Sequence, residues 1–186
     1  PMIDTDAASA PARPGDAAPR HAAGVRIALH PGLVKTATST LQRHVFPRHE
    51  DIAWLGLPAP SAALAWAIRH LAQADTIHFE ADRVREVFAR ALAAVPVDRL
   101  ALVSYENLAL YESKDKGVVA QRLAGLFPGA TILFTIRRQE DLVVSWYLTK
   151  LRVRIKRKAY VPFAEWWEVE GREPHASIRD DLLYGR

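Results

Sequence analysis

The chain contains no cysteine among its 186 residues. Disulfide bonds and thiolate metal sites are therefore excluded, and the fold has to be stabilised by packing and hydrogen bonding alone. The sequence also lacks any run of eighteen or more apolar residues, because even the alanine-rich stretch 61–74 carries Arg69, His70 and Gln73. Since a membrane-spanning helix needs such a run, we expect a soluble, cytoplasmic protein with no membrane partner.

The first 24 residues are rich in alanine, proline and acidic side chains and have no apolar core of the kind found in signal peptides. We interpret residues 1–24 as a disordered tail or as what remains after removal of a tag. The remainder, residues 25–186, is expected to form one domain. Hydrophobic residues make up 49% of the chain and charged residues 25%, which is ordinary for a globular domain.

Short apolar runs of strand length alternate with segments whose apolar residues recur at helical spacing. The predicted strands are 25–30, 51–56, 100–103 and 131–136, and the predicted helices are 39–46, 61–71, 80–94, 113–127 and one that begins near 139. Such alternation is typical of right-handed βαβ units. We therefore predict an α/β fold with a parallel β-sheet flanked by helices, in which 100–103 is a central strand and 131–136 is the clearest strand.

The segment HPGLVKTATST, residues 30–40, lies between the first predicted strand and the first predicted helix. The first N–H groups of a helix have no partner within it, and the helix dipole is positive at that end, so a phosphate is stabilised there. Lys35 adds a full positive charge, and the loop also offers hydroxyl donors, namely Thr36, Thr38, Ser39 and Thr40. This loop is predicted to bind a polyanion.

The loop departs from the phosphate-binding motif of nucleotide kinases, GxxxxGK[ST], because Val34 stands where that motif has the glycine before its lysine. The run 131–136 ends in Arg137 and Arg138 rather than in a carboxylate that would hold magnesium. Arginine at a strand end binds anions, so we expect no metal site. A small-molecule kinase remains an alternative.

The segment HPGLVKTATSTLQ resembles the 5′-phosphosulfate loop of sulfotransferases that use 3′-phosphoadenosine 5′-phosphosulfate (PAPS), particularly bacterial members with loops like HKTGTTSLQ. The resemblance implies a three-layer, P-loop NTPase-like architecture and PAPS as the cofactor, with PAP as its product. It implies that Lys35 contacts the phosphosulfate and its bridging oxygen as a catalytic cation. The rest of the implied nucleotide-binding loop is Gly32, Thr36, Ala37, Thr38, Ser39 and Thr40, where Ala37 replaces a common glycine.

A second motif carries the same resemblance. In this family a strand ends in an arginine, and a serine follows eight positions later on the next helix; Arg137 and Ser145 have that spacing. The resemblance implies that both side chains hold the 3′-phosphate. Many members have proline two residues after the arginine, where this chain has Gln139. Arg138 is then expected to be a surface or salt-bridging residue.

Sulfuryl transfer also needs a base that takes the proton of the acceptor. Glu106 follows the predicted central strand, and ligands gather at the carboxyl ends of parallel strands; Ser104 and Glu106 match a serine–x–glutamate pattern of bacterial relatives. We therefore assign Glu106 as the catalytic base. A structural role for Glu106 as a cap or ion-pair partner is the alternative, and His30 and His78 are further candidates for the base.

The basic run KLRVRIKRK, residues 150–158, is the end of a helix, an exposed strand or a substrate-facing loop, and it suggests an anionic glycan or a small molecule as acceptor. No base-reading motif accompanies it, which argues against nucleic acid. Phe163, Trp166 and Trp167 fit helix packing. The resemblance covers residues 25–147, and because family members usually continue with another strand, it implies that the usual C-terminal part is missing. An inactive nucleotide-binding scaffold is the rival interpretation.

Overall fold

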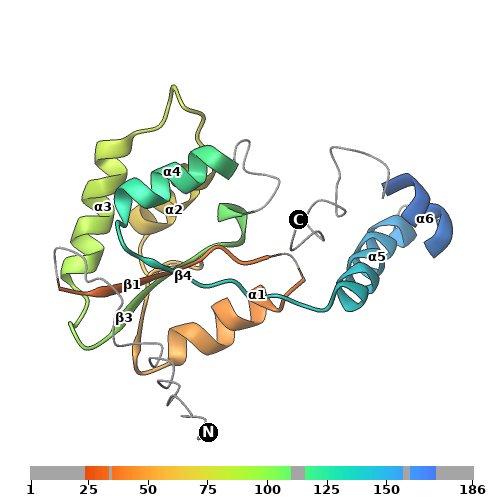
Figure 1. The fold of residues 1–186 in the computed structure, drawn as a ribbon, viewed down its shortest axis with the longest axis horizontal. Coiled ribbons are helices and arrows are strands. Elements are labelled where there is room, and N and C mark those ends of the chain that lie inside the picture. The colour runs from red at the N-terminus through yellow and green to blue at the C-terminus, as the bar shows by residue number, and fades with distance from the viewer. Residues whose placement is uncertain (1–23, 34, 110–115, 157–159, 171–186) are drawn as a thin grey trace, which may run out of the picture.

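The computed structural model describes residues 24–33, 35–109, 116–156 and 160–170 (Figure 1). Four parallel strands form one sheet in the order β2-β3-β1-β4. They are β1 (Arg26–His30), β2 (Ile52–Trp54), β3 (Leu100–Ser104) and β4 (Thr131–Ile132). The predicted α/β fold with a parallel sheet is thus confirmed in its general form.

The two central strands are β1 and β3, which pair in register from Arg26 opposite Leu100 to His30 opposite Ser104. Both strands are buried apart from their first residue, and the residues 27–29 and 100–103 are apolar on both faces, as expected for strands covered on both sides. The prediction that 100–103 is a central strand is confirmed. Since the strands are parallel, His30 and Ser104 lie at the same edge of the sheet, namely the edge formed by the carboxyl ends of the strands. The segments that follow them therefore begin side by side.

Helices cover both faces of the sheet. On one face lie α2 (Ala62–Gln73), α3 (Ala81–Ala93) and α4 (Lys116–Leu126), whose apolar residues form the main core together with Ile27 and Leu29 of β1. On the other face lies one continuous helical segment that is α-helical over Thr38–Thr40 (α1), π-helical over Leu41–Val45 (η1) and 3-10 helical over Phe46–Arg48 (η2). Its Phe46 packs on Ala28 and Leu102.

The ends of α2 are satisfied by side chains from two parts of the chain. Ser61 caps its beginning, because its Oγ accepts a hydrogen bond from the N–H of Leu64 at 3.2 Å. At its end, Arg122 of α4 donates to the carbonyls of Leu71 and Ala74 at 3.0 and 2.8 Å. Arg122 therefore ties α4 to the last turn of α2.

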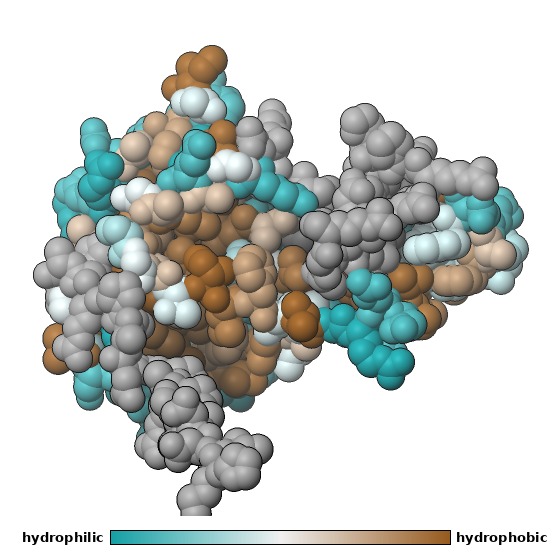
Figure 2. Space-filling model, in the orientation of Figure 1, coloured by the Kyte–Doolittle hydropathy of each residue, from teal (hydrophilic) through white to brown (hydrophobic). Residues whose placement is uncertain are grey.

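The prediction that 131–136 is the clearest strand is wrong in extent. Only Thr131 and Ile132 form β4, and one further hydrogen bond joins the N–H of Leu133 to the carbonyl of Leu29 at 2.8 Å. Within the described residues β4 is an edge strand. Ile132 and the apolar residues that follow the strand are exposed, namely Leu133, Phe134 and Ile136. Hydrophobic residues gather over the middle of the face shown in Figure 2. The apolar run predicts a buried strand, but regular pairing also needs a neighbour.

The last two helices, α5 (Gln139–Lys156) and α6 (Phe163–Glu170), pack on each other beside the sheet domain (Figure 1). Their contact is a separate cluster of Leu142, Trp146 and Trp166. The prediction that the aromatic residues near 163–167 serve helix packing is confirmed. The basic run is helical as far as Lys156, and its last two residues lie outside the described part. No helix in the described ranges is both long and apolar enough to cross a membrane.

Candidate functional site

The loop between β1 and α1 turns sharply, with positive φ angles at Gly32 (62°), Lys35 (61°) and Ala37 (64°). Gly32 is required, because a Cβ added there would lie 2.7 Å from Cγ2 of Thr38. Ala37, which stands where the resembling family commonly has glycine, adopts the left-handed conformation that glycine favours. The loop thus carries backbone strain at two residues that have side chains.

The hydroxyl groups of Thr36 and Thr38 close this loop from inside. Both donate to the carbonyl of Leu33, at 2.7 and 3.0 Å, and both residues are buried. Binding of a phosphate by these hydroxyls, which stays a prediction, would require them to turn. Ser39 and Thr40 are exposed in the first turn of the helix, where the N–H groups of Thr38 and Ser39 have no preceding turn to bond.

Arg137 and Lys35, predicted to hold opposite ends of the nucleotide, lie next to each other. Nη1 of Arg137 donates to the carbonyl of Lys35 at 3.1 Å, while Nζ of Lys35 lies 5.9 Å from the centre of the Trp146 ring. Ser145 precedes Trp146 on α5 and is half-buried. The loop, the end of the β4 segment and α5 therefore meet at one place. Arg138 is exposed and pairs with Glu140 at 3.7 Å, as predicted.

Glu106 lies at the same edge of the sheet. It begins the 3-10 turn Glu106–Leu108 (η3) that follows β3, and its Oε1 accepts a hydrogen bond from Oγ of Ser39 at 3.2 Å. The carboxylate therefore faces the first turn of α1. This contact is compatible with the assigned role as base and with the alternative role as a structural cap, so both interpretations remain predictions.

Of the two histidines considered as alternative bases, only His30 lies at this edge. It is fully buried, and burial lowers its pKa, so its ring is neutral at physiological pH. Nδ1 lies 2.7 Å from Oγ of Ser104, and Nε2 lies 3.3 Å from Oγ1 of Thr135. His78 lies elsewhere, exposed in the connection between α2 and α3, where it contacts Asp75 at 2.8 Å.

Two residues of the site, Gln42 and Thr135, are not identified by the sequence analysis. Nε2 of Gln42 donates to Oγ of Ser104 at 2.9 Å, and Oγ1 of Thr135 lies 2.8 Å from Oγ1 of Thr36. A signal was available for each. Gln42 is a polar residue four positions before the apolar Phe46 on the same side of a helix, and Thr135 stands two positions before Arg137 in an apolar run.

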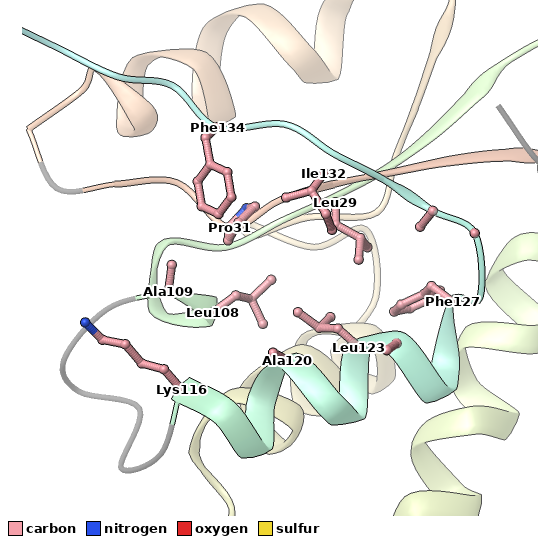
Figure 3. A pocket seen from close by; sticks show the side chains of 13 residues that line it. Leu29, Pro31, Leu108, Ala109, Lys116, Ala120, Leu123, Phe127, Ile132 and Phe134 are labelled. Carbon is pink, nitrogen blue, oxygen red and sulfur yellow. The ribbon is translucent and has the colours of Figure 1, made fainter. Parts of the chain in front are cut away.

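A cavity of about 560 Å³ lies between α4 and the β1–β4 side of the sheet (Figure 3). Leu123 and Phe134 contribute to its apolar wall, and Lys116 is the one charged residue in the described lining. Pro31, at the start of the loop, and Leu108 and Ala109, just after Glu106, line it as well. The cavity therefore adjoins the segments that carry Lys35 and Glu106.

In the part of the chain that the structure describes, no three His, Asp or Glu side chains come close enough together to share a metal ion. Comparison of the chain with models of known protein families, with curated protein sequences and with solved structures finds no match.

Proposed function

We propose that this chain is a PAPS-dependent sulfotransferase domain, which transfers a sulfuryl group to a hydroxyl or amine of an acceptor. One observation carries the proposal. Two cations and a carboxylate, from segments that follow three different parallel strands, lie at a single edge of the sheet: Lys35 after β1, Glu106 after β3 and Arg137 after β4. The general α/β fold is compatible with the P-loop-like architecture that the resemblance implies.

The charges at this edge favour a multiply phosphorylated ligand. A guanidinium presents a planar fork of donors that matches a phosphate, and an ammonium supplies a compact charge beside it. Helical N–H groups at Thr38 and Ser39 add further donors for an anion. A nucleotide with phosphates on both its 5′ and 3′ sides would engage the loop and Arg137 together, with Ser145 as the further donor that the resemblance implies.

The proposed chemistry needs no group beyond the donor, the acceptor and these side chains. The acceptor oxygen or nitrogen bonds to sulfur while the bond between sulfur and the bridging oxygen of the phosphosulfate breaks. Glu106 takes the acceptor proton, and Lys35 stabilises the negative charge that develops on the departing phosphate. The two side chains thus act on opposite sides of the transferred group.

The cavity supports an acceptor with an apolar body rather than a glycan. Ligand pockets of this size accommodate a small organic molecule, and their apolar walls contribute most of the buried surface. Leu108 and Ala109 connect the cavity with Glu106 through the η3 turn. Glu106 itself does not line the cavity, and its carboxylate contacts Ser39, so the hydroxyl group of an alcohol or phenol seated there would have to extend beyond Leu108 to meet the proposed base.

The first test is calorimetric titration of the whole chain with PAP, the desulfated product, and with ATP in the presence of magnesium. We expect PAP to bind and magnesium–ATP to bind at least about tenfold more weakly. Tighter binding of magnesium–ATP would favour the small-molecule kinase. Absence of PAP binding would overturn the sulfotransferase proposal.

An activity assay distinguishes the sulfotransferase from the rival interpretation, a scaffold that binds the nucleotide but does not catalyse transfer. A transferase loses transfer when Lys35→Ala or Glu106→Gln is introduced, whereas a scaffold binds PAP and transfers nothing to any acceptor. Transfer of labelled sulfate from PAPS to a panel of alcohols, phenols and amines measures this difference directly.

A further inference from the structure

A chain of side-chain hydrogen bonds crosses the edge of the sheet beneath the loop. It runs from Gln42 to Ser104, from Ser104 to His30, from His30 to Thr135 and from Thr135 to Thr36, with distances of 2.9, 2.7, 3.3 and 2.8 Å. Thr36 then donates to the carbonyl of Leu33 at 2.7 Å. The imidazole of His30 therefore lies in the middle of this chain of hydrogen bonds. It connects the helical segment that carries Gln42 with the loop that carries Thr36.

The Gln42 amide fixes the direction of the first bond in this chain, and the short bond from Thr36 to Leu33 favours one direction at the other end. Nε2 of the Gln42 amide can only donate, so Oγ of Ser104 accepts from it and has its own proton to give to Nδ1 of His30. At the other end Oγ1 of Thr36 lies 2.7 Å from the carbonyl of Leu33, which can only accept, and 3.1 Å from Oγ1 of Thr38. With its proton on the shorter of these two bonds, Thr36 accepts from Thr135. Thr135 must then accept from Nε2–H of His30. Each proton has one acceptor in this arrangement.

The other protonation states break this order. If Nδ1 carried the only proton, Ser104 would accept two bonds and its own proton would have no acceptor within the chain of hydrogen bonds. Thr135 would donate to Nε2, so Thr36 would have to give up its 2.7 Å bond to Leu33 in order to donate to Thr135. A doubly protonated ring would leave the proton of Ser104 without its acceptor. Burial also disfavours a cation, since the ring is fully buried, with Phe46 packed against it in a T-shaped arrangement at 5.3 Å between the centres.

We infer that His30, neutral and protonated on Nε2, is the positioning residue that holds the anion-binding loop in its strained conformation through Thr135 and Thr36. The effect on the ligand rests on the proposed function, whereas the tautomer and the loop conformation do not. His30 acts through Thr36 and is not itself placed to touch the nucleotide.

Two substitutions distinguish the hydrogen bond at Nε2 of His30 from the hydrogen bond at Nδ1. In His30→Gln, the side-chain amide reaches the position of Nε2 and can still donate to Thr135, whereas in His30→Asn it reaches only toward Ser104. We expect His30→Asn to weaken PAP binding about tenfold and to speed hydrogen exchange of the amides of residues 35–38. For His30→Gln we expect the PAP affinity and the exchange rates to stay within about threefold of those of the unsubstituted protein. Phe46→Leu is the control, because it loosens packing on the ring without removing a hydrogen bond.

The decisive measurement on the unsubstituted chain is a long-range proton–nitrogen NMR spectrum of the histidine rings at neutral pH. A proton on Nε2 and a bare Nδ1 are expected for His30. A proton on Nδ1, or equal effects of His30→Asn and His30→Gln on loop exchange, would overturn the inference. If PAP fails to bind, the proposed function fails, but the NMR and exchange results still decide the role of His30. If a variant does not fold, the tautomer decides alone.

Discussion

The guanidinium of Arg137 donates a hydrogen bond to the backbone carbonyl of Lys35, with 3.1 Å between Nη1 and the oxygen. The two residues are 102 positions apart in sequence, and each follows a different strand of the sheet. The contact therefore joins the loop after β1 to the segment after β4. It gives Arg137 two roles in the proposed site, since the same guanidinium orients the loop and offers its remaining donors to a phosphate.

Replacing Arg137 tests the second anion-binding group. Arg137→Lys keeps the charge but loses the planar fork, so we expect about a tenfold loss of PAP affinity, and Arg137→Met should lose about a hundredfold. Calorimetry measures both. The neighbouring Arg138 provides the matched control, because it is exposed and pairs with Glu140; Arg138→Met should change PAP affinity less than about twofold. Equal effects at the two arginines would mean that only net charge matters.

Glu106→Gln tests the proposed base. The amide oxygen can still accept the hydrogen bond from Ser39, but the side chain can no longer take a proton, so kcat should fall at least about a hundredfold while PAP affinity stays within about twofold. The control is Glu86→Gln, since Glu86 is exposed on α3 and pairs with Arg90. If Glu106→Gln retains transfer but lowers Tm, the carboxylate is a structural cap.

The order of strands and helices could be predicted because buried positions are occupied by apolar residues, whose spacing differs between strands and helices. β1 and β3 are covered on both faces, so their residues form continuous apolar runs, and α3 is covered on one face, so Val84, Phe88 and Leu92 recur at helical spacing. The extent of β4 could not be predicted in the same way. Its apolar residues indicate burial, but strand length depends on which segments pair beside it.

Of the candidate site, only the residues whose charge indicates a function could be predicted from the sequence. Lys35, Glu106 and Arg137 carry charge at strand ends, so parallel topology alone suggests that they meet. The chain of hydrogen bonds from Gln42 to Thr36 could not be predicted, because Gln42, Ser104 and Thr135 are ordinary polar residues whose partners come from distant elements. Nor does the sequence show that the hydroxyls of Thr36 and Thr38 turn inward to Leu33.

The left-handed conformation of Ala37 predicts an unusual gain in stability. A residue with a Cβ costs about 1 kcal/mol at a positive φ relative to glycine, so Ala37→Gly should raise the free energy of unfolding by up to about that amount. Urea unfolding measures the change. The control, Ala89→Gly in the exposed middle of α3, should lower stability by about 1 kcal/mol. A loss in both variants would show that Ala37 is not strained.

The buried ring of His30 predicts how stability depends on pH. Its pKa in the folded chain lies below the ordinary value of 6.5, because burial disfavours the charged ring. Below pH 6.5 the unfolded chain therefore binds a proton that the folded chain does not, and stability rises with pH in this range. The contribution is fully present above pH 6.5 and is lost as the pH falls toward the folded pKa.

Thermal unfolding between pH 5 and 8 tests this dependence by comparing the unsubstituted chain with His30→Gln. The stability difference between the two should shrink as the solution is acidified. Lys35 and Arg137, near the same edge, oppose a further positive charge, whereas Glu106 favours it. Asp75 titrates below this window, because its hydrogen bonds with His78 lower its pKa. A difference that stays constant with pH would show that His30 is not protonated more readily on unfolding.

Filling the cavity tests the proposed class of acceptor. Ala120 lines it from α4 (Figure 3), so a tryptophan introduced there would occupy the space proposed for an apolar acceptor. In Ala120→Trp, the KM for 2-naphthol should rise about tenfold with PAP affinity unchanged, because the loss of one well-buried contact surface costs about that factor in binding. Ala89→Trp adds the same side chain on the exposed side of α3 and should leave KM unchanged. Transfer to glucosamine but not to 2-naphthol by the unsubstituted chain would contradict the apolar acceptor, while leaving the nucleotide site intact.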